Sequence, residues 1–264
     1  MHVESASTER TGQPLHRLHL LYHELRPGGS KYSYVLTPLA FDRHLDLFVQ
    51  LRKDESRAAW PEVTFDDGHI SNYEYALPAL DARGMIARFF ITVGWVGKKP
   101  GFMGWPELRS LQQSGQLIGA HGWSHTLLTH CNREELNREL SGAKQMLEDK
   151  LGTQITTMSL PGGRHNRHVL AACREAGYIQ IFTSVPRPEP TPLGFLVGRL
   201  NIRGDMMLDY LRALHQSGSR ALASLERQSR LKATAQTVMG DKLYEKLWGL
   251  LNRKEPEGGE DNPA

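Results

Sequence analysis

The sequence predicts an α/β fold with a mainly parallel sheet, and two observations support this prediction. Short apolar runs typical of buried strands alternate with segments whose apolar residues recur at helical spacing. Three polar clusters, Asp66/Asp67, His121/His125 and residues 161–164, each follow a predicted strand. Open parallel sheets and closed β/α barrels both carry their sites at this edge. We favour a β/α barrel, because a closed sheet easily brings three separated strand ends to one point.

The first predicted strand covers residues 18–22, and a loop rich in glycine and proline follows over 26–33. The first helix covers about 38–52, because its large apolar residues recur every three or four positions. Residues 62–65 have the composition of a buried strand. This strand leads directly into the paired aspartates.

Two helices and two strands come next, and a glycine follows each helix. Glycine most readily adopts the left-handed conformation of a helix end. The segments are, in order, a helix over 73–83, a strand over 86–93, a helix over 106–114 and a strand over 116–120. The last of these strands delivers His121.

A long helix is then predicted to begin after Asn132, with Glu135 three residues later as its capping-box partner. It should end at Leu151, before Gly152. The remaining segments are, in order, a strand over 156–160, a helix over 166–177, and strands over 178–182 and 195–201.

The bulk properties fit one globular domain with an appendage. The chain has 264 residues, a net charge of +3 and two cysteines, so neither a nucleic-acid partner nor a disulfide framework is expected. The expected parts are a flexible arm over 1–15, a barrel domain over 16–214, a helical extension over 215–254 and a disordered tail over 255–264. No signal peptide or transmembrane segment is evident, so we expect a cytoplasmic location.

The helical extension is basic. Residues 217–254 contain eight Lys/Arg and three Asp/Glu and resemble two amphipathic helices, the second over 241–252. A solvated helical face packed on the domain is the favoured interpretation. Docking of residues 217–254 to a membrane surface or a protein is the alternative.

The paired aspartates and the two histidines together offer ligands for a divalent metal. One Asp and two His make a three-ligand site, and the spare Asp can accept a proton from a metal-activated water. Two His and one carboxylate also form the site of non-haem iron oxygenases, so an oxygenase is an alternative. The spare Asp66 favours hydrolysis.

The run Thr64-Phe65-Asp66-Asp67-Gly68, followed by His121-Gly122-Trp123-Ser124-His125, resembles the first two motifs of the polysaccharide deacetylase family, carbohydrate esterase family 4 with NodB homology. Residues 20–23 and 103–108 are similar to that family's flanking segments. The resemblance covers roughly residues 17–205. It implies a distorted β/α barrel that removes an N- or O-acetyl group from a sugar or glycan precursor through metal-activated water.

The resemblance also implies residue roles. Asp67, His121 and His125 would bind the metal, usually Zn²⁺, with Fe²⁺, Mn²⁺, Co²⁺ or Ni²⁺ as alternatives, and Asp66 would be the general base. The metal and a backbone N–H in the turn after the 156–160 strand would stabilise the oxyanion. The residues expected at the substrate in this turn are Pro161, Gly162, Gly163 and Arg164.

The chain departs from the family in its later motifs. The family usually has an Arg two residues before the proline, where this chain has Ser159, so we expect Arg164 or Arg199 to contact Asp66 instead. The family's late histidine acid is also absent, because the 195–201 strand offers Arg199 in its place; His165 is the candidate substitute. No late Asp-Trp motif is visible.

Two further interpretations stay open. One is a hydrolase of another non-peptide carbon–nitrogen bond, because families related to the one resembled act on non-sugar amides. The other is a degenerate glycan-binding protein without catalytic activity.

Overall fold

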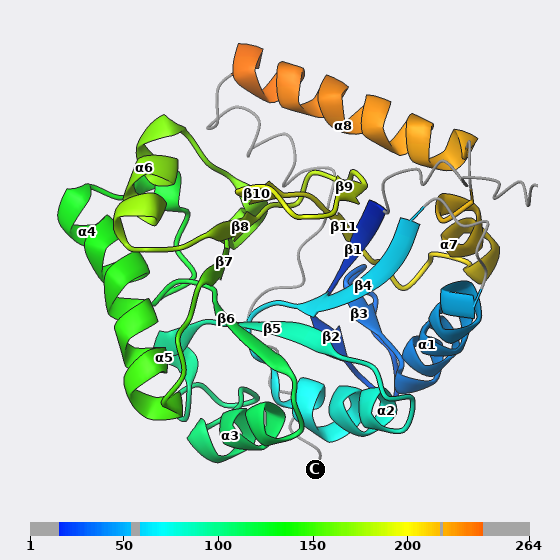
Figure 1. The fold of residues 1–264 in the computed structure, drawn as a ribbon, viewed down its shortest axis with the longest axis horizontal. Helices are drawn as coiled ribbons and strands as arrows, with labels where there is room; N and C mark the ends of the chain where they lie inside the picture. The colour runs from blue at the N-terminus through cyan, green and yellow to red at the C-terminus, as the bar shows by residue number, and fades with distance from the viewer. Residues whose placement is uncertain (1–15, 54–58, 217–218, 240–264) are drawn as a thin grey trace, which may run out of the picture.

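A parallel sheet that curls into a nearly closed barrel forms the body of the molecule (Figure 1). The computed structural model describes residues 16–53, 59–216 and 219–239. The strand order is β10-β8-β7-β6-β5-β4-β1-β11 with parallel neighbours, and β9 pairs antiparallel with β1. The predicted barrel-like α/β class is therefore confirmed.

The strands of this sheet are short, and the predicted ones all appear. They are β1 (His16–Tyr22), β4 (Ala59–Phe65), β5 (Ala87–Ile91), β6 (Leu117–Ala120), β7 (Thr157–Ser159), β8 (Gln180–Phe182), β9 (Glu189–Pro190), β10 (Leu196–Val197) and β11 (Arg199–Asn201). A separate parallel pair, β2 (Glu24–Leu25) and β3 (Val35–Leu36), lies outside this sheet.

The strand predicted over 195–201 is divided at Gly198. Its first part, β10, pairs with β8, and its second part, β11, pairs with β1. A Cβ at position 198 would lie 2.4 Å from the Val185 carbonyl oxygen, so only glycine fits this approach. One chain segment therefore joins the two ends of the sheet and nearly closes the barrel.

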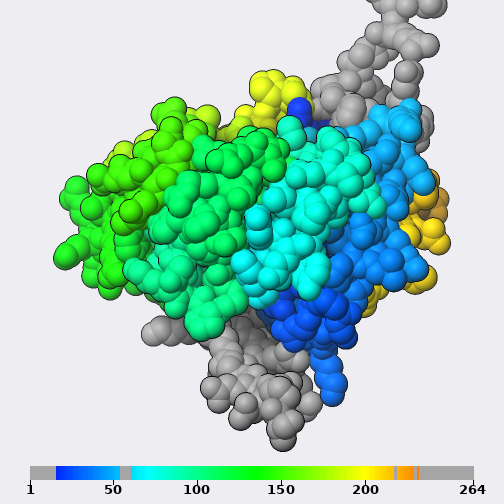
Figure 2. Space-filling view, turned by 90° about the horizontal axis from the view of Figure 1, so that it is seen from below, coloured from blue at the N-terminus to red at the C-terminus, as the bar shows by residue number. Residues whose placement is uncertain are grey.

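Helices surround the sheet, as Figure 1 shows. They are α1 (Pro38–Lys53), α2 (Leu77–Asp81), α3 (Trp105–Gln113), α4 (Arg133–Asn137), α5 (Ala143–Leu151), α6 (Arg167–Glu175), α7 (Leu208–Leu214) and α8 (Arg220–Met239). Figure 2 shows one face of the molecule. On this face, α1 and α2 (blue to cyan) and the green middle part of the chain form one continuous surface. Among the described helices, none is long and apolar enough to cross a membrane.

The long helix predicted over 132–151 is present with one local change. The Asn132 side chain accepts from Glu134 N and Glu135 N, while Glu135 accepts from Asn132 N, so the predicted capping box forms. A π-helical turn, η4 (Arg138–Gly142), separates α4 from α5. A similar turn, η1 (Asn72–Ala76), precedes α2 in the second predicted helix. Such turns occur frequently at functional sites.

An apolar core fixes the strands against the helices. Phe41 and Phe48 of α1 are fully buried, and Phe65 at the end of β4 stacks on Phe89 of β5 with ring centroids 5.0 Å apart. Complete burial of one such side chain contributes about 1.5–3 kcal/mol. This packing holds the end of β4, from which the paired aspartates project.

The last described helix is α8, which follows α7. Leu222 of α8 is buried, and Leu225 packs against the same core. The buried His215 lies against Phe48 of α1. The predicted arm over 1–15, the second extension helix over 241–252 and the tail over 255–264 lie outside the described residues.

Candidate active site

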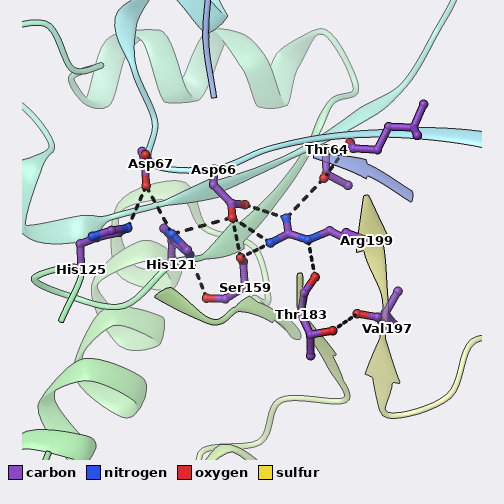
Figure 3. A network of polar contacts seen from close by, with 10 residues as sticks. Thr64, Asp66, Asp67, His121, His125, Ser159, Thr183, Val197 and Arg199 are labelled. Carbon is purple, nitrogen blue, oxygen red and sulfur yellow. Dashed lines mark hydrogen bonds and ion pairs between the residues drawn. The ribbon is translucent and has the colours of Figure 1, made fainter. Parts of the chain in front are cut away.

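The two sequence clusters meet at the carboxyl ends of two parallel strands that have β5 between them (Figure 3). Asp66 and Asp67 follow β4, and His121 follows β6. His125 lies four residues farther along the same loop. The strand order β7-β6-β5-β4 brings these ends together, as the sequence predicted.

Asp67, His121 and His125 form a three-residue cluster whose ligand atoms lie within 4.8 Å of one another. Asp67 Oδ1 lies 3.3 Å from Nε2 of His121 and 3.3 Å from Nε2 of His125. This oxygen is buried, and no hydrogen-bond donor reaches it from the described residues. An unsatisfied carboxylate oxygen facing two imidazole nitrogens is costly by itself. A divalent cation would satisfy all three atoms, so the donor set fits a metal.

A backbone contact fixes the orientation of His121. Its Nδ1 lies 2.9 Å from the Ser159 carbonyl oxygen. A carbonyl can only accept, so we assign the proton to Nδ1, and the Nε2 lone pair then faces Asp67. Histidine ligands of metals almost always have such an outer partner. The His125 ring instead packs against Trp95, with centroids 5.3 Å apart.

The backbone is strained at two of these three residues. Asp67 (φ 72°) and His125 (φ 64°) are the two non-glycine residues with positive φ in the described ranges. The left-handed conformation costs an L-residue about 1–2 kcal/mol, although Asp and His adopt it more readily than most. Strain of this kind concentrates at functional sites, and both residues belong to the candidate metal cluster.

Glu139 holds the loop that carries both histidines, and the sequence analysis did not identify it. This buried carboxylate accepts from Trp123 N (2.7 Å), Ser124 N (3.0 Å) and Ser124 Oγ (2.6 Å). Gly122 lies so near that a Cβ there would be 2.9 Å from Glu139 Oε2. Glu139 and the adjacent Leu140 are both buried, but no short-range pattern in the sequence marks the role of Glu139.

Asp66 is held by Arg199, one of the two predicted arginine candidates. Arg199 Nη1 donates to Asp66 Oδ1 (2.7 Å), and Nη2 donates to Oδ2 (2.8 Å). Ser159 Oγ donates to Asp66 Oδ2 (2.8 Å) and accepts from Arg199 Nη2 (2.6 Å). Figure 3 shows the guanidinium directed at the carboxylate from β11. Arg164, the other candidate, is partly exposed in the segment after β7.

Charges in the site keep both aspartates ionised. Burial alone would raise the pKa of Asp66, but the Arg199 charge and then His121 outweigh it, so this pKa is lowered. The pKa of Asp67 is also lowered, because His121 and His125 outweigh its burial.

The two histidines shift in opposite directions. Burial lowers the pKa of His121, but Asp66 and Asp67 outweigh it and the net pKa is raised. The pKa of His125 is lowered by burial and by the charge on His121. His121 lies close to both carboxylates, and their negative charges account for its raised pKa, in contrast to that of His125.

The glycine turn predicted at the substrate lies beside the histidine loop. Pro161 is buried, and a Cβ on Gly122 would be 3.7 Å from its Cγ. Gly162 (φ 64°) and Gly163 (φ 70°) are left-handed, and the Gly163 N–H donates to Leu160 O within the turn. Contact of this turn with substrate stays a prediction.

The predicted acid, His165, is exposed between this turn and α6. In the described part of the chain, no contact joins its ring to the aspartates or the other histidines. Its assignment as an acid stays a prediction.

These features define a class of protein: a parallel β/α barrel with an Asp-Asp and His-His constellation suited to hydrolysis at the carboxyl ends of its strands. Residues 55–181 match the family described as polysaccharide deacetylase. This match confirms the resemblance that the first two motifs indicated. Arg199 lies beyond the matched segment.

Similarity to individual proteins is moderate. The chain is 30% identical over 124 residues to YxkH of Bacillus subtilis (strain 168), covering 47% of this chain and 44% of that protein. It is 26% identical over 125 residues to peptidoglycan-N-acetylmuramic acid deacetylase PdaA of the same strain, covering 47% and 46%. The chain thus spans less than half the length of these relatives.

Solved structures confirm the fold. The Streptococcus pyogenes deacetylase PplD, solved in complex with acetate, superposes with a TM-score of 0.68 at 18% identity. The match covers 77% of this chain and 100% of that one. At this identity, the likeness establishes the barrel and leaves the substrate open.

Proposed function

We propose that this protein is a metal-dependent hydrolase that removes the acetyl group from an N-acetylated sugar in a glycan or glycan precursor. The observation that carries the proposal is the cluster of Asp67, His121 and His125, with Asp66 beside it as a second, separately held carboxylate. The family match supports deacetylation as the reaction.

Asp67, His121 and His125 would hold the metal, for which Zn²⁺ is the first choice. When bound, the metal would supply the Lewis acidity that lets a water molecule lose a proton near neutral pH. The other steps fall to the chain's own residues. Asp66 accepts the proton from the attacking water, and the water oxygen adds to the amide carbon. The carbon–nitrogen bond then breaks, acetate leaves with the new oxygen, and the amine nitrogen takes up a proton, for which His165 is the candidate donor. The turn from Pro161 to Gly163 lies beside this loop and is the proposed position of the oxyanion donor.

Arg199 and Ser159 prepare Asp66 for this role. Their hydrogen bonds occupy both carboxylate oxygens, so the side chain is held in one orientation. The lowered pKa keeps it unprotonated and able to accept a proton. The degenerate, non-catalytic interpretation was motivated by the missing leaving-group acid and by the absence of an arginine at position 159. Arg199 supplies the missing guanidinium from another strand, which supports an active enzyme.

Elemental analysis of the purified protein and an acetate-release assay on chito-oligosaccharides test the proposal. We expect about one divalent metal per chain, and release that falls at least about 100-fold in Asp66→Asn. Asp149→Asn, an exposed acid on α5, is the matched control and should retain activity. Full release by Asp66→Asn would refute the base assignment. Metal-loaded protein that releases no acetate from any acetylated glycan would favour a glycan-binding protein or an oxygenase.

A further inference from the structure

The Arg199 guanidinium, which holds Asp66, also packs against aromatic rings inside the barrel. Its five hydrogen bonds run along the edge of the guanidinium and match the five N–H donors of an arginine side chain. Its two flat faces carry no donor, so packing alone supports them. The ring centroids of Phe90 and Phe182 lie 5.2 Å and 5.8 Å from Arg199 Cζ.

We propose that Phe90 of β5 is a positioning residue for the reaction, because its ring supports one face of the Arg199 guanidinium and keeps both Nη atoms on the Asp66 carboxylate. The part of this inference that concerns catalysis rests on the proposed function, in which Asp66 is the general base. The contact between the ring and the guanidinium does not depend on that function. Phe90 lies outside the motifs that indicated the family.

A glycine on the neighbouring strand makes room for the Phe90 ring. Phe90 is fully buried and lies opposite Gly119 where β5 pairs with β6. A Cβ at position 119 would lie 2.6 Å from Cδ1 and Cε1 of Phe90 and 2.7 Å from Thr157 Oγ1. The ring therefore occupies the space that a side chain on β6 would take. Held against the β6 backbone, it is a firm support for the guanidinium.

Phe182 of β8 contributes to the same enclosure but is shared between two cations. Its ring centroid lies 4.9 Å from that of Phe90. The guanidinium of Arg88 lies over the Phe182 ring at 5.7 Å, in addition to that of Arg199. Replacement of Phe182 would therefore disturb both arginines, so Phe90 is the more specific residue to change.

A ring face is a favourable neighbour for a guanidinium that has lost its water. The electron-rich face attracts a cation within about 6 Å, and the attraction is stronger where both groups are desolvated. The Arg199 side chain has no exposed surface, so water does not replace the ring when it is removed. Leucine at position 90 would leave the guanidinium free to tilt. Tilting lengthens the paired hydrogen bonds to Asp66, whose strength depends on their geometry.

Acetate release by Phe90→Leu tests the role in catalysis. We expect kcat to fall about 10-fold while KM stays within about 2-fold of the wild type, because the base is displaced and no substrate contact is removed. Gly119→Ala is a second variant. It keeps Phe90 and Arg199 but displaces the ring, and it should lower kcat in the same way.

The matched control for lost packing is Leu111→Ala. Leu111 is fully buried on α3, so its truncation leaves a cavity in the helical layer and lowers stability. It should keep the wild-type kcat, because α3 contributes nothing to the arginine and its rings.

A double-mutant cycle with Arg199→Met shows whether the ring acts through the guanidinium. Once Arg199 is replaced, Phe90→Leu should lower kcat by less than about 2-fold more. In urea unfolding, the two substitutions together should change the folding equilibrium constant about 5-fold less than the product of their single effects. The unfolding measurement needs no turnover, so it tests the contact independently of the enzyme's activity.

The outcomes separate this inference from the proposed function. Wild-type kcat in Phe90→Leu overturns it, as do independent effects of Phe90→Leu and Arg199→Met on unfolding. Wild-type kcat in Gly119→Ala also overturns it, so the test stands even where Phe90→Leu does not fold. Coupled effects on unfolding in a protein that never releases acetate retain Phe90 as the support of Arg199 and refute the deacetylase.

Discussion

Arg199→Met is the most informative perturbation of this protein. The guanidinium is fully buried and makes two hydrogen bonds to Asp66, one to Ser159 Oγ, one to the Thr183 carbonyl and one to Thr64 Oγ1. Methionine has an unbranched side chain that can fill most of the space but supplies no charge. The substitution therefore leaves the Asp66 carboxylate buried without its main partner.

The expected loss of stability follows from that burial. Removing one partner of a buried ion pair costs about 3–5 kcal/mol when the other charge remains. Asp66 can escape part of this cost by taking up a proton, because burial raises its pKa once Arg199 is gone. Urea unfolding at pH 8 should show the full loss. The loss should be smaller at pH 5, where protonation is easier.

The sign of the pH dependence is also fixed. In the wild type, the pKa of Asp66 is lowered in the folded state. Its contribution to stability is therefore present above the unfolded pKa, near 3.9, and is lost as pH falls through the folded value. In Arg199→Met the folded pKa is raised, so stability should fall as pH rises through that value. The acid limb of the pH–rate profile should move to higher pH for the same reason.

Arg203→Met is the matched control. Arg203 pairs with Asp205 at the surface, where the side chains are 50% and 70% exposed, and such a pair contributes about 0–1 kcal/mol. The reasoning would be refuted if Arg199→Met lost no more stability than Arg203→Met and kept the wild-type pH–rate profile.

Three other predictions concern the metal cluster, its supporting loop and the long helix. His121→Ala and His125→Ala should each lose bound metal by elemental analysis, because each removes one of three ligands; unchanged stoichiometry would exclude these ligands. Glu139→Gln should lower metal affinity about 10-fold in a competition titration, because it weakens the hydrogen bonds that hold the histidine loop. A metal affinity equal to that of the wild type would show that the histidine loop does not need the Glu139 carboxylate to keep its position. Asn132→Ala should lower the free energy of unfolding by about 1 kcal/mol without changing acetate release, because it removes only a helix cap.

The fold and the proximity of the paired aspartates to the two histidines could be predicted because their signals are local. Strands and helices repeat short patterns, and the caps at Asn132 and Gly152 lie within a few residues of the ends they define. Each pair of residues consists of close neighbours in the sequence and follows a recognisable strand; the pairs are Asp66 with Asp67 and His121 with His125. Their meeting required parallel strands in one curved sheet, with β5 between β4 and β6, and the alternation already indicated a parallel sheet.

Other features depended on contacts between distant segments. The break at Gly198 arises from the close approach of the Val185 carbonyl, and the role of Glu139 arises from a loop 15–16 residues away. The left-handed backbone at Asp67 and His125 is imposed where the loops pack. None of these has a short-range pattern in the sequence.

The sequence by itself determined the α/β class and the set of candidate metal ligands, because both depend on the order of residues along single elements. Only the tertiary structure decided which arginine holds Asp66. Arg199 is 133 residues from Asp66, and it reaches the carboxylate because β11 pairs with β1, with Arg199 opposite His19, while β1 pairs with β4. That meeting is a consequence of the near closure of the sheet, which no local pattern encodes.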